Sequence, residues 1–260
     1  MSCVYSQTNV SQVTDDAFSI VLSKDWDIWG PNGGYLSAIL LRAVGAFCCH
    51  SQPISIHVQY LAVAKYNQAD ITVRPVKQGR SMSAYNVQLH QDGKTIANAQ
   101  VQTGNPQEGI EHLYLPLPPT YCELENAKDR SIRGDMPFWE NLEIRSGKKA
   151  EGHWGNWYRF DEDIKPIDSF AEAARSIVLI DSMQWPAAWR AHNGKVPYTA
   201  PSLDLYVQFH QPAFDSPWLF SNAHAQTAAQ GLVGGTAPVW DESSILIASG
   251  GSQSLCRRLP

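Results

Sequence analysis

The chain has 260 residues, of which 43% are hydrophobic and 17% charged, which is typical of a globular protein with one large or two average domains. Its net charge of −5 provides no bulk attraction to nucleic acid or to an anionic membrane, so neither is expected as a partner. The five cysteines form no CxxC pair and the histidines show no HxxxH or HExxH spacing, so we expect reduced thiols, no metal or cofactor and a cytoplasmic location.

The polar N-terminal segment and the most apolar stretch of the chain both lack the features of an export signal or a membrane span. Residues Met1–Asp16 are polar and lack the apolar core of a signal peptide. The most apolar stretch, Tyr35–Cys49, contains Arg42 and is too short to span a bilayer. No membrane span is expected.

The first hundred residues have the pattern of a strand, a buried helix and an antiparallel meander. The strand is Ala17–Leu22, a turn with Gly33 and Gly34 follows, and Tyr35–Val44 is apolar almost all round, as in a buried helix. The strands expected after it, with a hairpin turn at Gln91–Lys94, are Pro53–Leu61, Asp70–Val76, Ser81–His90 and Thr95–Thr103.

An irregular stretch separates this unit from a second one. Residues Asn105–Pro119 are rich in Pro, Gly and Glu, and the chain stays charged and irregular as far as about Asp135. We therefore predict domains at 1–110 and 136–260 with a linker at 111–135. The strands and the two helices expected in the second domain are Asn141–Arg145, Asn156–Phe160, Ser169–Ile180 (helix), Asp181–His192 (helix), Ser202–His210, Trp218–Ala225, Val233–Trp240 and Ile245–Cys256.

The two halves share one order of elements at one offset. Val207 falls on Val58 (207 − 149 = 58), the turn at Asp241 on the turn at Asp92 (241 − 149 = 92), and Ala187 on Ala38. The alternative is one antiparallel α+β domain with a coincidental echo. A duplicated unit has a physical advantage, because a second copy covers the apolar face and sheet edge of the first.

Several segments resemble a known family in the same order along the chain. Gly33–Ala43 resembles the start of the hotdog helix of bacterial acyl-CoA thioesterases, Ile54–Leu61 the strand after it, and Gln78–Ser83 the Gly-Arg-Ser turn. Ser202–Pro212 resembles the matching strand of the second half in thioesterase II, the TesB type. This likeness implies an α+β double hotdog, in which each half wraps an antiparallel sheet around a long helix.

The resemblance also implies a function: hydrolysis of fatty acyl-CoA to free acid and CoA by general-base activation of water, with no metal or cofactor. The partner is then the acyl-CoA substrate. A homo-oligomer is expected as well, since hotdog sheets often pair.

The catalytic set implied by the resemblance is Asp181, Ser202 and Gln253. In thioesterase II an aspartate starts the second hotdog helix, a threonine starts the next strand and a glutamine lies near the C-terminus, and these three residues occupy those places here. Asp181 is then the general base, and Ser202 and Gln253 hold the attacking water. Serine replaces the family threonine, and the segment before Gln253 is one residue longer than in the relative.

Each of these positions has a structural alternative. Asp181, with Gln184 three residues later, has the spacing of a helix N-cap and capping box. Gly33 and Gly34 are expected to bind the oxyanion and substrate through their N–H groups, or else to form a tight turn before a buried helix. Ser202 and Gln253 alone would be ordinary strand residues.

Two other functions remain open at this stage. One is a non-catalytic module that binds acyl thioesters. The other is a hotdog hydratase or dehydratase, for which His57 is the candidate base. Six tryptophans are candidates for an acyl tunnel or for core packing: Trp26, Trp29, Trp154, Trp157, Trp185 and Trp189.

Overall fold

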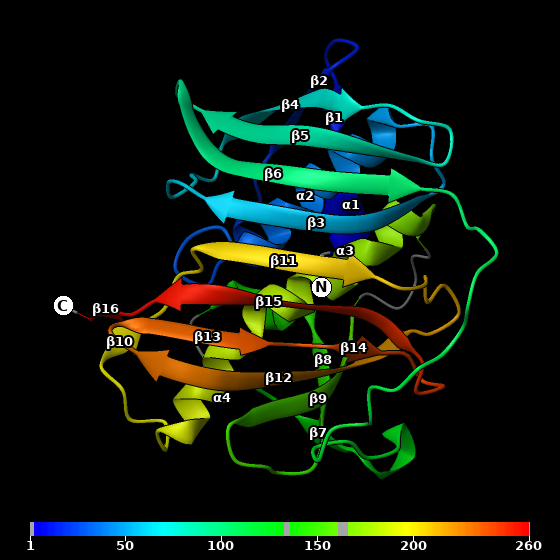
Figure 1. Ribbon diagram of the computed structural model, residues 1–260. Helices are drawn as coiled ribbons and strands as arrows, with labels where there is room; N and C mark the ends of the chain where they lie inside the picture. The colour runs from blue at the N-terminus through cyan, green and yellow to red at the C-terminus, as the bar shows by residue number, and fades with distance from the viewer. Residues whose placement is uncertain (1–2, 133–135, 161–165, 260) are drawn as a thin grey trace.

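A single curved sheet wrapped around two central helices dominates the computed structural model, which describes residues 3–132, 136–160 and 166–259 (Figure 1). The helices are α1 (Val4–Gln7), α2 (Gly33–Phe47), α3 (Ser169–Ser182) and α4 (Gln184–Ala191), with 3-10 turns at Lys24–Trp26, Leu124–Asn126 and Pro137–Asn141. The strands are β1 (Ser11–Gln12), β2 (Ala17–Val21), β3 (Gln52–Tyr60), β4 (Gln68–Lys77), β5 (Met82–Gln91), β6 (Lys94–Gly104), β7 (Lys128–Arg130), β8 (Glu143–Ser146), β9 (His153–Arg159), β10 (Tyr198–Thr199), β11 (Asp204–Phe209), β12 (Trp218–Ala229), β13 (Leu232–Thr236), β14 (Val239–Trp240), β15 (Leu246–Leu255) and β16 (Arg257–Arg258).

The sheet joins the two halves of the chain through their central strands. Among the described residues its order is β1-β2-β4-β5-β6-β3-β11-β15-β13-β12-β9-β8-β7, and β3 and β11 pair antiparallel at the junction. Ile56 lies opposite Val207 and Val58 opposite Leu205, and all four side chains are buried. Their period of two places the apolar residues of both strands on the face that carries the helices. The predicted double hotdog is confirmed.

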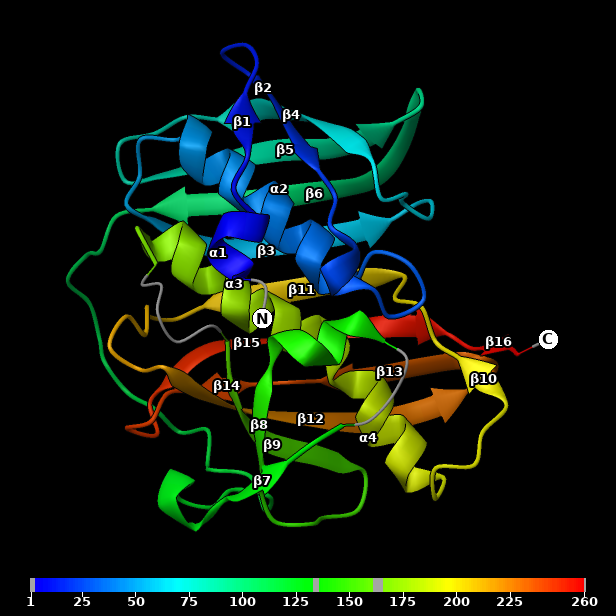
Figure 2. The same cartoon turned by 180° about the vertical axis from the view of Figure 1, so that it is seen from behind.

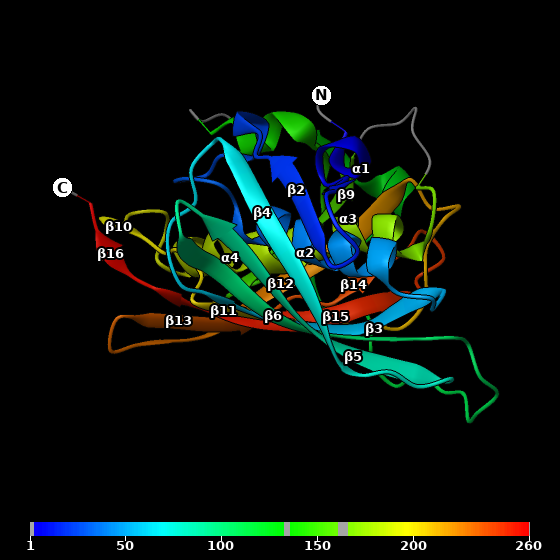
Figure 3. The ribbon, with the colours of Figure 1, turned by 90° about the horizontal axis from the view of Figure 1, so that it is seen from above.

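The helices α2 and α3 lie side by side on the concave face of the sheet, which wraps around them (Figures 2 and 3). They run antiparallel, because Gly34 approaches Val178 and Asp181 while Gly45 approaches Phe170. Every residue from Gly34 to Val44 is buried. A helix that is apolar on all sides suits this position between a sheet and a second helix.

Parts of the predicted linker pack against the second half. Tyr121 packs with four aromatic side chains on the face of the sheet away from the helices, namely Trp157, Trp218, Phe220 and Trp240. Further along, β7 pairs with β8. Residues 133–135 of the predicted linker lie outside the described residues, and the predicted domain boundaries stay a prediction.

In the second half a short helix, α4, directly follows the long helix α3, and the boundaries of the two correct two predictions. The helix α3 continues through Asp181 to Ser182, and α4 begins at Gln184, so Asp181 does not start a helix. The N-cap of α3 is Asp168, whose side chain accepts a hydrogen bond from Ala171 N. Ala187 lies in α4, so its match to Ala38 in the long helix is wrong. No helix in the described ranges is both long and apolar enough to cross a membrane.

Candidate active site

A cavity of about 550 Å³ opens where the two central helices meet the strands that join the halves. Gly33 lines it at the N-terminus of α2, and Asp181 lines it near the C-terminal end of α3. Tyr60 at the end of β3 and Ser202 just before β11 lie on its strand side. Elements from both halves thus contribute polar groups to one place. A concave site with a few convergent polar groups is typical of a ligand-binding cavity.

Asp181 is the buried carboxylate of this cavity, with 6% of its surface exposed. Its Oδ2 accepts hydrogen bonds from Gly34 N at 2.8 Å and from Asn32 Nδ2 at 3.2 Å. Its Oδ1 is also buried and has no hydrogen-bond partner among the described residues. One oxygen is therefore anchored to the N-terminus of α2, and the other keeps its lone pairs available. A buried acceptor without a partner is costly and often marks a functional group.

Burial raises the pKa of the Asp181 carboxyl above its ordinary value, because the charged form loses hydration. Ser202, the Gly34 N–H, Asn32 and Tyr60 act in the opposite direction and lower it by hydrogen bonding or close polar contact. The Ser202 hydroxyl thus lies close enough to Asp181 to stabilise its charge, although the pair misses the geometry of a full hydrogen bond. A carboxylate with a raised pKa is a better proton acceptor at neutral pH than an exposed one.

Two glycines allow the helices to approach this closely. A Cβ on Gly34 would lie 2.8 Å from the Cα of Val178 and 3.1 Å from the Cβ of Asp181. A Cβ on Gly33 would lie 2.8 Å from the ring of Tyr60 and 3.0 Å from Oδ2 of Asp181. Any larger residue at either position would push the carboxylate away from the N-terminus of α2.

The two glycine N–H groups have different surroundings. The Gly34 N–H donates to Asp181, so it is already engaged. Gly33 is half-buried and lines the cavity, and its N–H has no partner in the hydrogen bonds of the described residues. Because the free N–H groups of a helix N-terminus attract negative charge, Gly33 is the position that could face an oxyanion.

The structure brings Asp181 and Ser202 together but places Gln253 elsewhere. Gln253 lies on β15 with its side chain exposed, and its backbone N donates to the carboxylate of Asp204. Its neighbours Ser252 and Ser254 are buried, as the period of two of a strand requires, and Ser254 lines the cavity. The role of Gln253 stays a prediction.

The opposite end of the helix pair shows why the site is asymmetric. A relation of 136 residues takes Gly34 to Phe170 and Gly45 to Asp181 (170 − 34 = 181 − 45 = 136). The contact of Gly34 with Asp181 is accordingly replaced by a contact of Phe170 with Gly45. At the opposite end, Phe170 occupies the position equivalent to Gly34, and Gly45 occupies the position equivalent to Asp181.

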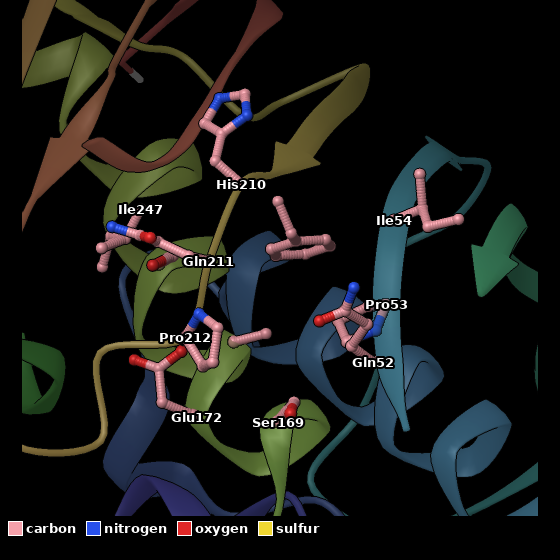
Figure 4. A pocket seen from close by; sticks show the side chains of 12 residues that line it. Gln52, Pro53, Ile54, Ser169, Glu172, His210, Gln211, Pro212 and Ile247 are labelled. Atoms are coloured by element: carbon pink, nitrogen blue, oxygen red, sulfur yellow. The ribbon is translucent and has the colours of Figure 1, made fainter. Parts of the chain in front are cut away.

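The hollow at that opposite end is small, about 50 Å³. Figure 4 shows the residues that line it, among them Ser169 and Glu172 from α3, Pro53 from the start of β3 and His210 from the segment after β11. Glu172 is paired with Arg175 at 2.7 Å, so its carboxylate is neutralised. Only the end with Asp181 combines a large cavity with an unpaired carboxylate oxygen among the described residues.

Two polar residues of the site were missed as functional candidates. Asn32 caps α2 through its Oδ1, which accepts from Tyr35 N, while its Nδ2 donates to Asp181 and to Ser182. The sequence feature that could have identified Asn32 is its position directly before the glycine pair. Tyr60 bonds Ser37 through its hydroxyl at 2.7 Å, and burial followed by the charge of Asp181 raises its pKa well above its ordinary value.

The remaining candidates divide between cavity, core and surface. Trp29, Trp154, Trp185 and Trp189 line the cavity, whereas Trp26 and Trp157 are fully buried in the packing of the two halves. His57 is exposed on the face of the sheet away from the helices. It therefore has no access to the cavity, which disfavours the dehydratase alternative. The described residues contain no group of three or more His, Cys, Asp or Glu side chains placed to hold a metal.

Comparison with known proteins agrees with this geometry. A model of the acyl-CoA thioesterase N-terminal domain matches residues 22–104, and a model of the acyl-CoA thioesterase C-terminal domain matches residues 118–254. No curated protein matched the sequence.

Solved structures match the fold over the whole chain. A conserved protein of unknown function with a hotdog fold from Alicyclobacillus acidocaldarius has a TM-score of 0.86 at 19% identity and covers 100% of both chains. The tesB protein of Mycobacterium avium subs paratuberculosis gives 0.81 at 20% identity, with 98% of each chain covered. The acyl-CoA thioesterase II TesB2 of Mycobacterium marinum gives 0.80 at 18% identity, again with 98% of each chain covered. The chain belongs to the acyl-CoA thioesterase family and is a thioester hydrolase of the double-hotdog fold.

Proposed function

We propose that the protein hydrolyses acyl-CoA to a free acid and CoA, with Asp181 as the general base. The observation that carries the proposal is that the two oxygens of this carboxylate have different surroundings. Oδ2 is held by Gly34 N and Asn32, while buried Oδ1 has no partner among the described residues and lies in a wall of the large cavity. A fixed base within hydrogen-bond reach of a water is what general-base catalysis needs.

In this mechanism a water held by Asp181 Oδ1 and the Ser202 hydroxyl attacks the thioester carbonyl carbon. Its proton moves to Asp181, and the carbonyl oxygen becomes an oxyanion. The free N–H of Gly33 and the positive end of the α2 dipole stabilise that charge. The C–S bond then breaks, and the CoA thiolate takes the proton from Asp181. The products are the carboxylic acid and CoA thiol, and the carboxylate is restored.

Gln253 was predicted to hold the same water, and its exposed side chain on β15 gives this role little support. We propose that Asp181 and Ser202 are sufficient. Among the polar residues of β15, Ser254, which directly follows Gln253, is the one that lines the cavity.

The test is release of free thiol from a panel of acyl-CoAs of increasing chain length, with wild type, Asp181→Asn and Gln253→Ala assayed side by side. We expect turnover in the wild type, a loss of about 10²–10⁴ in kcat/KM for Asp181→Asn, and little change for Gln253→Ala. Circular dichroism verifies that each variant is folded. Binding of acyl-CoA without turnover at any chain length would contradict the proposal and favour a binding module.

A further inference from the structure

Several indole rings line the cavity, although the thioester chemistry does not require them. Five of the nine tryptophans of the chain line this cavity: Trp29, Trp139, Trp154, Trp185 and Trp189. They come from the loop before α2, the 3-10 turn at Pro137–Asn141, β9 and α4. Indoles from four separate elements thus line the same cavity. The packing requirements of any one element do not account for this.

The helix α4 supplies two of these rings, and the described part of the first half has no helix directly after its long helix α2. Trp185 and Trp189 are four residues apart, so they lie on the same face of the helix. Trp185 packs edge-to-face against Trp29 from the other half, with centroids 6.2 Å apart and an interplanar angle of 75°. This pair spans the cavity wall between the two halves of the chain.

The rings remain accessible although they are large and apolar. Trp29 and Trp189 are 41% and 43% exposed. Deeper in, Trp154 is 6% exposed, and the guanidinium of Arg130 stacks on it at 4.1 Å from the ring centre, which fixes its orientation. Partly exposed indoles within a cavity gain most from a ligand that covers them.

Aliphatic side chains line the cavity too, among them Leu36, Leu61 and Val63. They contribute hydrophobic burial to a fatty chain and to a ring alike, so they do not discriminate between the two. The indoles do, because two aromatic rings gain about 0.5–1.5 kcal/mol per pair beyond area burial. A rigid ring also loses less conformational entropy on binding than a flexible chain does.

We infer that the preferred acyl group carries an aromatic ring, as in an aryl-acetyl or aryl-propanoyl thioester of CoA. The ring lies against the Trp29–Trp185 pair while the thioester carbonyl reaches Asp181. This inference rests on the proposed thioesterase function and goes beyond it by naming the class of acyl group.

The test compares phenylacetyl-CoA with cyclohexylacetyl-CoA, which has the same carbon count and nearly the same shape but no π system. We expect kcat/KM for the aromatic substrate to be higher by about two- to tenfold, the range of one aromatic pair. Trp185→Leu should reduce that ratio towards one, and Trp29→Leu, at a more exposed position, provides the same readout if the first variant folds poorly. Leu61→Ala is the matched control: it should lower both rates in parallel and leave the ratio unchanged.

A ratio of one or below in the wild type would overturn the inference while leaving the proposed function intact, and so would a ratio that both tryptophan variants leave unchanged. If neither ring substrate is hydrolysed while the straight-chain acyl-CoAs are, the inference is overturned and the proposed function stands. If no acyl-CoA of any chain length is hydrolysed, the proposed function fails, and calorimetry with non-hydrolysable thioethers decides the inference alone. In that measurement phenylethyl-CoA should bind more tightly than cyclohexylethyl-CoA. Equal affinity would overturn it.

Discussion

The close approach of the two central helices leads to a paired prediction. In Gly34→Ala the new Cβ would lie 2.8 Å from the Val178 backbone, with the Asp181 Cβ and the Asn32 Oδ1 both at 3.1 Å. Because backbone atoms are involved, the helices must separate where Oδ2 of Asp181 binds the Gly34 N–H. Overpacking of this kind costs about 1–3 kcal/mol. Replacing glycine by alanine in a helix stabilises by roughly 0.5–1 kcal/mol, so the net loss of stability should be at most about 2.5 kcal/mol.

The effect on catalysis should be larger than the effect on stability suggests. A displacement of the carboxylate by a few tenths of an ångström should lower kcat/KM by on the order of tenfold, because a 1 Å misplacement can cost about a hundredfold. The matched control is Gly45→Ala on the same helix, where a Cβ would meet the Phe170 side chain at 2.6 Å. It should destabilise to a similar degree and leave kcat/KM unchanged, since it lies at the opposite end of the pair.

Urea unfolding followed by circular dichroism measures the stability of both variants, and thiol release from an acyl-CoA measures kcat/KM. Equal losses of activity in the two variants would refute the reasoning. Full activity in Gly34→Ala would refute it as well, because the hydrogen bond from Gly34 to Asp181 would then be dispensable.

Three further predictions follow from the same contacts. Ser202→Ala should lower kcat/KM by about ten- to a hundredfold, as expected for one hydrogen bond in a charged network, and Ser202→Thr should restore it because the hydroxyl is kept; equal rates for Ala and Thr would contradict this. Asn32→Asp keeps the α2 cap but sets a second carboxylate beside Asp181, so the acid limb of the pH–rate profile should move to higher pH, and an unmoved limb would contradict the contact. Asp181→Asn should be more stable than wild type at neutral pH, because the pKa of Asp181 is raised in the folded state and its ionised form therefore opposes folding above that pKa. The stability advantage of the variant should shrink as the pH falls towards about 4. A wild type that is more stable than the variant at neutral pH would contradict this prediction.

Much of the architecture could be predicted from periodicity. The alternation along Ser81–His90 and Thr95–Thr103 and the turn between them correspond to β5 and β6, and the apolar run Tyr35–Val44 corresponds to α2. These signals are local, so each depends only on which face of an element is buried.

The wrong predictions concern the break between α3 and α4 and the relation between the two halves, which the local sequence pattern does not encode. The break between α3 and α4 falls at Met183, which keeps a helical backbone conformation, so the apolar period shows no interruption there. The extra helix then shifts the relation between halves, and the helices are related by 136 residues rather than 149. The offset of 149 would make Asp181 equivalent to Asn32 (181 − 149 = 32), whereas the two side chains are hydrogen-bonded to each other.

Gln253 illustrates a different limit. On a strand, a shift of one residue moves a side chain to the other face of the sheet, and the segment before Gln253 had one residue more than its relative. The contact of Gly34 with Asp181 joins residues 147 positions apart, and only the packed fold shows it. The predicted homo-oligomer and the cytoplasmic location stay predictions.

The most direct test of the central claim is the pH dependence of kcat/KM for acyl-CoA hydrolysis in wild type and Asp181→Asn. We expect a wild-type acid limb whose apparent pKa lies above the ordinary carboxyl value of about 4, because burial raises the pKa of Asp181. This limb should be absent from the residual activity of Asp181→Asn. A limb that persists unchanged in the variant would show that another group, and not Asp181, is the general base.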